Sequence, residues 1–450
     1  MRKLWSTLLN TCMLLLMTAS IAFAADGEVK IDTGDTAWVL ISAALVFIMT
    51  PGLGFFYGGM VRNKNVLSTI MQSFFIVGLI SVEWVLFGYT LTFGTDVSGL
   101  IGDLSKLGLN GIDVNTAMGT IPEFAFVAFQ CMFAVITPAL ITGAFAERMK
   151  FSAFVTFILL WAILIYNPMA HWVWGGGWLA ELGALDFAGG LVIHILSGVS
   201  GLVICLMIGK RRGFGKSPIL PHNIPMIVLG ATLLWFGWFG FNAGSALGAN
   251  GLAANAFIVT QAAAAAATVS WVFAEWMHNG KPTVFGAASG CVAGLVAITP
   301  AAGFVTPMPA VLIGLIGGVL CYFSVAVVKA RFGYDDSLDA FGVHGVGGTW
   351  GAIATGLWAT TSVNEAGADG LFYGNPELLY IQLISVVAAW VLAIVGTFVL
   401  IKLIGAVMKI RVDEVDEIAG VDISEHGERA YGQSFVAGNP MFRADSSLKE

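Results

Sequence analysis

Charged residues are scarce in this sequence. Aspartate, glutamate, lysine and arginine make up 11% of the 450 residues, against 57% hydrophobic residues, and the mean hydropathy is +0.85. Soluble domains carry about 25% charged residues. This scarcity excludes a soluble domain of such length and indicates an integral membrane protein. The net charge of −7 gives no reason to expect a nucleic-acid partner.

Cysteine is also rare, with five residues and no C-x-x-C spacing. Cys12 lies near the N-terminus, and Cys131, Cys205, Cys291 and Cys321 stand singly in apolar segments. This distribution excludes a disulfide framework and a cysteine-rich metal site. We therefore expect these four thiols to pack as small hydrophobic groups, and we expect no metal ion and no cofactor.

The first 24 residues have the pattern of a cleaved signal peptide. Arg2 and Lys3 precede an apolar stretch at 8–17, and residues 22–24 form an Ala-Phe-Ala cleavage sequence. The alternative is an uncleaved additional helix, but the apolar stretch is shorter than the roughly 20 residues that cross a bilayer. Cleavage would leave the mature N-terminus outside the membrane.

Eleven apolar segments long enough to cross a bilayer follow. They lie at 36–58, 67–94, 124–146, 151–174, 187–208, 224–247, 253–276, 283–300, 307–329, 338–359 and 377–405. Alternate loops between them hold the basic residues Arg62 and Lys64, Arg148 and Lys150, Lys210 to Arg212 with Lys216, Lys281, and Lys329 with Arg331, and the other loops hold only Lys106. Basic loops stay in the cytoplasm. We therefore predict an all-α membrane protein with eleven transmembrane helices, its N-terminus outside and its C-terminus inside.

An internal repeat places one histidine in each half of the chain. The stretch DFAGGLVIHILSG at 186–198 returns in altered form as DSLDAFGVHGVGG at 336–348, and His194 and His344 each follow an aspartate by eight residues. With five helices per copy, the two copies have opposite orientations and the eleventh helix is an addition. This is an inverted 5+5 repeat. A helical rise of 1.5 Å per residue carries each histidine about 12 Å inward from opposite faces, so the two side chains should meet near the midplane.

Ionisable residues inside a membrane are costly, which makes this histidine pair a functional hypothesis. Axial haem ligation, a proton relay and the lining of a narrow substrate path are the three uses that we consider. A haem needs space between the helices, whereas Gly342 and Gly345 around His344 indicate that two backbones approach closely. Asp186 also has a structural interpretation, as the N-cap of the helix that contains His194. Its carboxylate could in addition favour cations near the entry.

Aromatic residues and a hydroxyl gather toward the predicted outer side. They are Phe129, Phe133, Trp174, and the stretch WFGWFGFNAGS at 235–245, which ends at Ser245. Most such residues serve as core or interfacial residues. Aromatic faces together with a hydroxyl can also hold a small cation through cation–π attraction and a hydrogen bond. This combination suits ammonium.

These motifs resemble those of the bacterial ammonium transporters of the Amt/Mep/Rh superfamily. The resemblance is carried by DFAGGLVIHILSGVSGLVICLMIGKRRG at 186–213, AHWVWGGG at 170–177, GWFGFNAGSA at 237–246, ITPAAG at 298–303, FGVHGVGG at 341–348 and HGERAY at 426–431. It implies a homotrimer in the bacterial inner membrane with a hydrophobic pore within each subunit. It also implies an outer site for ammonium, made by Phe129, Phe133, Trp174 and Ser245. Phe133 and Phe241 would form a phenylalanine gate, and His194 and His344 would form the family's histidine pair. Asp186 and Asp336 match the family's two aspartates.

The physical chemistry of a narrow pore is compatible with this implication. An ion that enters a low-dielectric channel without water faces an idealised cost on the order of 20 kcal/mol. The pore therefore favours neutral ammonia over ammonium, and potassium has no proton to lose. We expect a transporter and not an enzyme. The alternatives that remain are a haem-binding redox protein and an ammonium sensor.

The C-terminal part differs in composition from the rest. We expect residues 25–411 to form the membrane domain and residues 412–450 to form a polar cytoplasmic tail. The stretch VDISEHGERAY at 421–431 resembles the regulatory tail motif of the family, which implies a PII-type signalling protein as partner. The loop residues Arg62, Lys64 and Arg148 are candidates to pair with the tail residues Asp422, Glu425 and Glu428.

Overall fold

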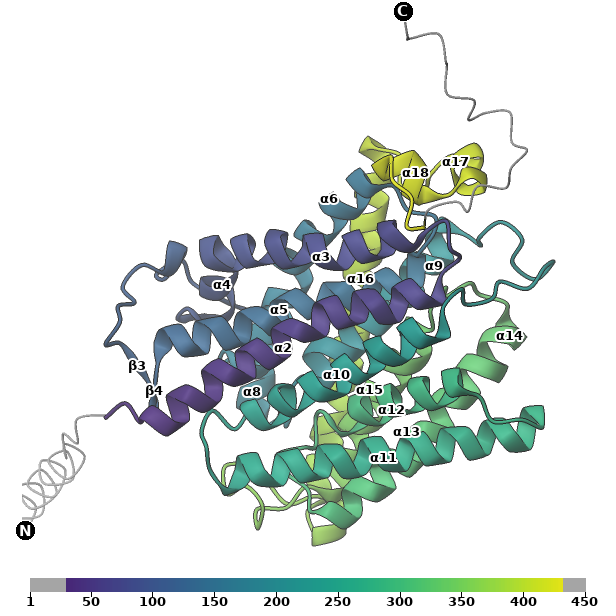
Figure 1. Cartoon of the computed structure of the whole chain (residues 1–450). Coiled ribbons are helices and arrows are strands. Elements are labelled where there is room, and N and C mark those ends of the chain that lie inside the picture. The colour runs from purple at the N-terminus through teal and green to yellow at the C-terminus, as the bar shows by residue number, and fades with distance from the viewer. Residues whose placement is uncertain (1–29, 432–450) are drawn as a thin grey trace, which may run out of the picture.

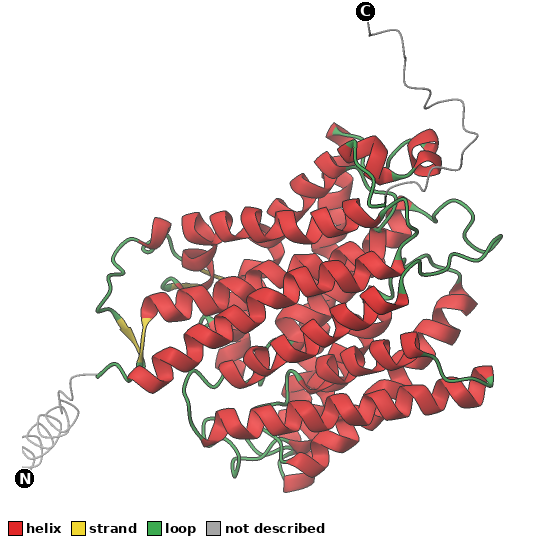
Figure 2. Ribbon diagram, in the orientation of Figure 1, coloured by secondary structure: helices red, strands yellow, loops and turns green. Residues whose placement is uncertain are grey.

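The computed structural model describes residues 30–431. The expected signal peptide and the last part of the expected tail lie outside the described residues. The described chain is mostly helical, with helices running back and forth along one common direction (Figures 1 and 2). Short strand pairs lie at one end of this bundle, and the tail helices lie at the other (Figure 1).

Nine helices of the described part are long and apolar enough to cross a membrane. They span Thr33–Met60, Val66–Phe93, Glu123–Phe145, Phe151–Leu182, Gly190–Ile208, Ile224–Gly244, Gly251–Asn279, Pro307–Phe332 and Pro376–Val407. The two other apolar segments expected from the sequence are also helical but shorter. They are α12 (Val284–Ile298) and the helical stretch formed by Phe341–Gly345 and α15 (Val346–Trp358).

Several of the long helices are built from consecutive pieces. The α-helical elements are α2 (Thr33–Met60), α3 (Val66–Glu83), α4 (Tyr89–Phe93), α5 (Glu123–Phe145), α6 (Phe151–Trp161), α7 (Asn167–Trp174), α8 (Trp178–Leu182), α9 (Leu196–Ile208), α10 (Ile224–Gly244), α11 (Gly251–Asn279), α13 (Pro307–Phe323), α14 (Lys329–Phe332) and α16 (Pro376–Val407). Two short helices of the tail follow, α17 (Glu414–Ala419) and α18 (Val421–His426). The 3₁₀ turns are Leu107–Leu109 and Leu371–Tyr373.

Five π-helical turns lie among the helices of residues 30–431. They are Trp84–Gly88, Ala162–Tyr166, Gly190–Ile195, Ser324–Val328 and Phe341–Gly345. Turns of this kind often occur at functional positions, because they shift the register of the side chains that follow. Two of the five contain His194 and His344 and begin the helical stretches in which these residues lie.

The packing separates a buried centre from an apolar outer surface. Helices α5 and α9 lie mostly inside the bundle, whereas α3, α11 and α16 are largely exposed along one side. Their exposed side chains include Phe74, Met277 and Val387. A surface of large apolar residues on long helices is what lipid contact requires. The four free cysteines of the described part are buried, as expected from the sequence.

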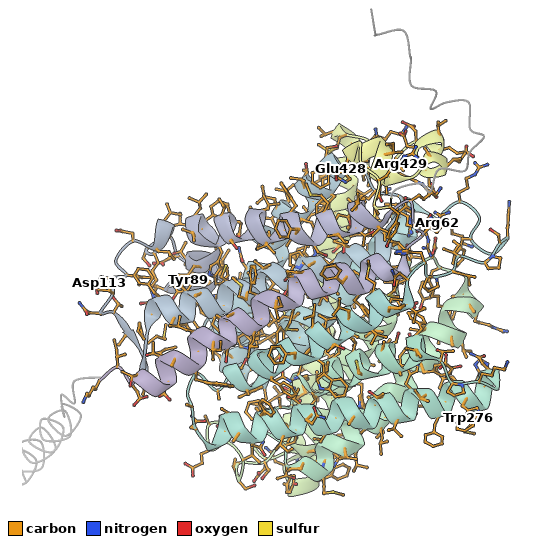
Figure 3. The ribbon with its side chains drawn as sticks, viewed as in Figure 1. Arg62, Tyr89, Asp113, Trp276, Glu428 and Arg429 are labelled. Carbon is orange, nitrogen blue, oxygen red and sulfur yellow. The ribbon has the colours of Figure 1, made fainter. Side chains whose placement is uncertain are left out.

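Polar segments close the two ends of the bundle. At one end, β1 (Asp96–Val97) pairs with β2 (Ile101–Gly102), and β3 (Ala117–Met118) pairs with β4 (Ile121–Pro122), both antiparallel. Asp113 lies at this end, and Glu428 and Arg429 lie at the opposite end on the tail (Figure 3). We call these the hairpin end and the tail end.

Candidate functional site

The two histidines of the repeat meet inside the bundle. Nδ1 of His344 lies 3.2 Å from Nδ1 of His194, and both side chains are buried. Their rings lie nearly parallel, with centroids 5.3 Å apart and an angle of 22° between the planes. One Nδ1 donates and the other accepts, so each ring keeps its Nε2 for other interactions. Nε2 of His194 is buried and has no hydrogen-bond partner.

Glycine allows the two helical stretches to come this close. A Cβ atom at Gly198 would lie 2.6 Å from Cα of Gly345, and one at Gly348 would lie 2.8 Å from Cβ of His194. Each π-helical turn packs against the α-helix that follows the other turn. The sequence indicated this close approach from the glycines near His344. The same contacts leave no room for a macrocycle between the two rings, which argues against haem ligation.

The two aspartates of the repeat cap these helical stretches. Asp186 accepts hydrogen bonds from the backbone N–H groups of residues 189 to 192, at 2.6 to 3.3 Å. Asp336 accepts from the N–H groups of Ala340 and Phe341, at 3.1 and 2.8 Å. A carboxylate at a helix N-terminus satisfies donors that have no partner within the helix. The capping interpretation of Asp186 is therefore confirmed, and both of its carboxylate oxygens face the backbone.

A column of aromatic rings leads from the hairpin end to the histidines. Phe133 lies 4.4 Å from Phe241 in a stacked arrangement, and 6.0 Å from Trp174 in an edge-to-face arrangement. Phe129 contacts Phe133 at 4.8 Å. Phe241 in turn stacks on His194 at 6.1 Å. Residues from α5, α7 and α10 thus form one continuous row with the histidine pair.

The two polar members of the expected outer site lie beside this row and are only half-buried. Nε1 of Trp174 donates to the carbonyl oxygen of Asp186 at 2.8 Å, which fixes the indole plane. The hydroxyl of Ser245 donates to the carbonyl oxygen of Phe241 at 2.9 Å. The lone pairs of the hydroxyl remain free to accept a further hydrogen bond. Phe129, Phe133 and Trp174 thus lie in contact, and Ser245 is joined to them through the carbonyl group of Phe241, whose ring stacks on Phe133.

A narrow cavity lies beside the histidines. It is lined by Met49, Leu53, Phe56, Ile136, Leu140, Ile193, His194, Leu234, Trp238, Phe241, Val292 and His344. The space open to the centre of a water-sized molecule is about 10 Å³, roughly that of one water. Apart from the histidines, these side chains are apolar or aromatic. The cavity therefore suits a small neutral molecule better than an ion.

Two further cavities continue toward the tail end. The first shares Phe56, Val292 and His344 with the histidine cavity and adds Ser289 and Asp339. The second shares Asp339 with the first and is wider, at about 270 Å³, with Arg211 and Lys329 on its wall. The three cavities thus form a series in which each shares wall residues with the next, and polarity rises toward the tail end.

The sequence did not single out several residues of this series. Trp238 stacks on His194 with centroids 5.4 Å apart, and its Nε1 donates to the hydroxyl of Thr299 at 2.9 Å. Trp238 belongs to the aromatic stretch at 235–245, but the sequence did not show that its side chain would stack on His194. Asp339 has a positive φ of 64° and pairs with Lys329 at 2.6 Å. The sequence carried no signal for that backbone conformation.

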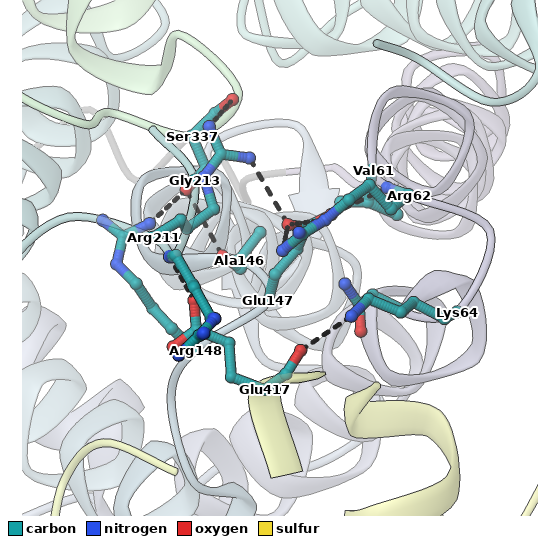
Figure 4. Close-up of polar contacts among 12 residues, drawn as sticks. Val61, Arg62, Lys64, Ala146, Glu147, Arg148, Arg211, Gly213, Ser337 and Glu417 are labelled. Atoms are coloured by element: carbon teal, nitrogen blue, oxygen red, sulfur yellow. Dashed lines mark hydrogen bonds and ion pairs between the residues drawn. The ribbon is translucent and has the colours of Figure 1, made fainter. Parts of the chain in front are cut away.

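A cluster of ion pairs and hydrogen bonds (Figure 4) borders the wide cavity through Arg211 and Ser337. Arg211 pairs with Asp335 at 2.8 Å, and Arg148 donates to the carbonyl oxygen of Asp335 at 2.6 Å and to the hydroxyl of Ser337. Glu147 pairs with Arg62. Burial alone would raise the pKa of Asp335, but the hydrogen bonds and charge of Arg211 outweigh it and hold this pKa below its usual value.

The tail packs on this end through its carboxylates. Asp422 accepts hydrogen bonds from the N–H groups of Leu67 and Ser68, at 3.0 and 2.7 Å. Glu425 accepts from the N–H group of Phe151 at 2.9 Å. Neither α3 nor α6 has a capping hydrogen bond from its own N-cap side chain. The tail therefore supplies helix caps to two long helices.

This arrangement corrects the pairing that the sequence suggested for the tail. Arg62 and Arg148 bond to Glu147 and to residues 335 and 337, not to the tail carboxylates. Lys64 donates to the carbonyl oxygens of Glu417 and Ile418, at the C-terminal end of α17. Carboxylates Asp422 and Glu425 find backbone donors instead, because uncapped helix N-termini offer N–H groups that are already ordered.

Within residues 30–431, no group of three or more histidine, cysteine, aspartate or glutamate side chains is arranged to hold a metal ion.

Comparison with known proteins relates this architecture to one family. The sequence matches the profile of the Ammonium Transporter Family over residues 37–431. It is 55% identical to an ammonium transporter of Bacillus subtilis, over 89% of this chain and 99% of that protein. The crystal structure of Saccharomyces cerevisiae Mep2 superposes with a TM-score of 0.82 at 35% identity, covering 90% of this chain and 93% of that one. A solved structure described as a sensor Amt protein has a TM-score of 0.81 at 30% identity, covering 87% of this chain and 98% of that one.

Proposed function

The chain belongs to the ammonium transporter family, and we propose that it captures ammonium at an aromatic site, removes a proton and conducts ammonia past a histidine pair. The observation that carries this proposal is the unbroken row from Trp174 through Phe133 and Phe241 to His194, next to a narrow apolar cavity. An ammonium ion can be attracted by the rings of this row only at its half-buried end, at Trp174.

In this proposal ammonium binds among Phe129, Phe133, Trp174 and Ser245. The indole face attracts the charge and the serine hydroxyl accepts a hydrogen bond from the ion. Phe133 and Phe241 then separate the capture site from the histidine cavity. Stacked rings 4.4 Å apart leave no gap for a hydrated ion, so passage requires that the rings move and that the substrate lose its water.

His194 and His344 offer the only polar contacts on the wall of the narrow cavity. Because their Nδ1 atoms bond each other, each Nε2 is available to ammonia or to the proton that ammonium gives up. In this proposal the released proton crosses separately along the two histidines, so net transport carries charge. Neutral ammonia can exchange hydrogen bonds with these nitrogens at little cost, whereas a bare ion would lose several kcal/mol of hydration. Selection therefore rests on the ability of ammonium to give up a proton, which potassium lacks.

We further propose that α12 and the stretch 341–358 cross the membrane as well, which gives eleven spans in an inverted 5+5 repeat with one additional helix. The support is the symmetry of the local structure. The π-helical turns Gly190–Ile195 and Phe341–Gly345 begin equivalent stretches, and Ala162–Tyr166 and Ser324–Val328 interrupt the stretches before them. Basic residues gather at the tail end, which supports an outer hairpin end and a cytoplasmic tail end.

The family relationship also supports a homotrimer in the bacterial inner membrane, after removal of residues 1–24. For the tail, we propose regulation by a cytosolic PII-type protein. The support is that the tail docks on helix ends at the same end of the bundle as the wide cavity. A protein bound there could change both the position of the tail and access to this cavity. An ammonium sensor remains the alternative function, because a protein described as a sensor shares this fold.

Ammonium-jump current recordings on proteoliposomes test the function directly. We expect the wild type to give currents with ammonium and none with potassium. His194→Ala and His344→Ala should each lose selective ammonium current, while His278→Ala, which removes a histidine bonded to Tyr322 elsewhere in the bundle, should behave as the wild type. If both pore variants carried ammonium normally and still excluded potassium, the proposal would be wrong. Ammonium binding without any current in the wild type would favour the sensor.

A further inference from the structure

A third buried histidine lies at the hairpin end and is not part of the pore. Nδ1 of His171 lies 2.8 Å from the carbonyl oxygen of Thr92, and Nε2 lies 2.8 Å from Oδ1 of Asp96. The imidazole is fully buried, while the Asp96 side chain is 36% exposed. His171 lies about one helical turn before Trp174 in α7, so it is close along the helix to a residue of the proposed capture site.

The two partners determine the protonation of this ring. A neutral imidazole has one donor nitrogen and one acceptor nitrogen, but a carbonyl oxygen and a carboxylate oxygen can only accept. Both nitrogens must therefore donate, which requires the doubly protonated imidazolium. Hydrogen bonds from His171 and from the N–H group of Gly99 hold the pKa of the Asp96 carboxyl below its usual value, so the carboxylate stays charged and the imidazolium has a counter-ion.

The turn that follows Trp174 packs closely against His171 and the hairpin. A Cβ atom at Gly175 would lie 2.5 Å from Nδ1 of His171, and the N–H group of Gly177 donates to the His171 carbonyl oxygen at 3.0 Å. The N–H group of Trp178 donates to the carbonyl oxygen of Gly99, in the hairpin that contains Asp96. The turn that follows Trp174 is thus fixed against His171 and the hairpin.

We propose that His171, bonded to the Thr92 carbonyl oxygen and to the Asp96 carboxylate, is a positioning residue for Trp174, and that loss of the bond to Asp96 weakens ammonium capture. This inference rests on the proposed role of Trp174 in capture. Loss of the Asp96 carboxylate removes one of the hydrogen bonds that join α7 to the hairpin, beside those from Trp172 Nε1 to Leu100 and from the Trp178 N–H group to Gly99. The turn that follows Trp174 is then held less firmly, while the pore beyond it is unchanged.

No other charged group competes for this ring. The further titratable side chains on elements that pack against α7, or bonded to it, are Glu83, Tyr89, Tyr166, Glu181 and His194. Glu83 bonds to Asn167, Tyr89 bonds to Glu123, and His194 bonds to His344. Tyr166 is buried without a charge and Glu181 is exposed.

The test measures the apparent KM and the maximal current for ammonium at one pH. In Asp96→Ala we expect KM to rise by roughly threefold to tenfold, which is what one hydrogen bond is worth, with less change in the maximal current. Asp96→Asn should keep the KM of the wild type, because an amide can still form a hydrogen bond with the imidazole. Asp103→Ala, in the same hairpin but bonded to Thr95 and Ser105, should also keep it.

His171→Gln provides the second arm, because one amide cannot donate to two opposite acceptors. We expect it to raise KM as Asp96→Ala does, with less change in the maximal current. An unchanged KM in both Asp96→Ala and His171→Gln would overturn the inference while leaving ammonium transport intact. Absence of selective ammonium current in the wild type would instead contradict the proposed function, so the two failures are distinguishable.

Discussion

Gly198 and Gly345 lie in direct backbone contact at the crossing of the two histidine-containing stretches. A Cβ atom at Gly198 would come within 2.6 Å of Cα of Gly345. The distance between these two backbones determines whether the rings of His194 and His344 can reach each other.

We therefore predict that Gly198→Ala lowers stability and separates the histidines. Overpacking of a rigid crossing costs about 1–3 kcal/mol, so the apparent Tm of the purified protein should fall, and any protein that still folds should lose selective ammonium current. Gly78→Ala is the control, because a Cβ atom there has nothing within 4 Å. Equal Tm and current in both variants would show that the crossing is not tight.

For the capture site, we predict that Trp174→Leu and Ser245→Ala raise the apparent KM for ammonium by roughly twofold to tenfold, the range of one cation–π contact. The maximal current should change less, because the pore beyond Phe133 is untouched. Trp276→Leu, at an exposed position on α11, controls for the general effect of losing a tryptophan. An unchanged concentration dependence in both capture variants would argue against a cation site at this end.

The capping role of the tail can be tested with one carboxylate. Asp422→Ala removes the cap of α3, at a cost of about 1 kcal/mol, which increases the undocked tail about fivefold. Limited proteolysis of the tail should be faster by this factor, whereas Glu428→Ala, at an exposed tail position (Figure 3), should leave the rate unchanged. Equal rates would mean that Asp422 does not hold the tail.

Truncation after Arg411 tests the regulatory proposal. The shortened protein should still insert into the membrane, because the long apolar helices in the described part of the chain all end by Val407. We expect altered ammonium flux and no inhibition by the PII-type protein. If flux and PII binding both matched those of the full-length chain, the tail would be a passive extension.

The ionic cluster at the tail end predicts an acid limit of stability. Asp335 has a folded-state pKa below its usual value, so its contribution to stability is present above the unfolded pKa and is lost as the pH falls through the folded one. The apparent Tm should therefore hold down to about pH 4 and fall below it. Asp335→Asn removes the carboxylate 2.8 Å from Arg211 and leaves only that of Glu147 at 3.6 Å. Breaking a buried ion pair costs about 3–5 kcal/mol, so this variant should lose up to that amount, whereas Asp369→Asn, in the loop between α15 and α16, should lose far less. A variant as stable as the wild type would contradict the importance of the Arg211–Asp335 pair.

Much of this protein follows from local features of the sequence. The apolar segments specified where the helices lie, because hydropathy depends only on the residues within each segment. Asp186 capped the helix that follows it because a carboxylate can reach the N–H groups of the next few residues. The repeated spacing also identified His194 and His344 as a pair, and the family motifs named the aromatic residues around them.

Only the tertiary structure decided which distant groups meet. His344 bonds to His194 across 150 residues, Trp238 stacks on His194, and the Asp422 carboxylate caps a helix 354 residues earlier. The sequence suggested basic side chains as partners of the tail because it shows charges, whereas the free N–H groups of a helix end exist only once the helix has formed. The two acceptors that bond to His171 likewise come from a stretch of chain 79 and 75 residues earlier, so the hydrogen bonding of that ring is set by the fold and not by the residue.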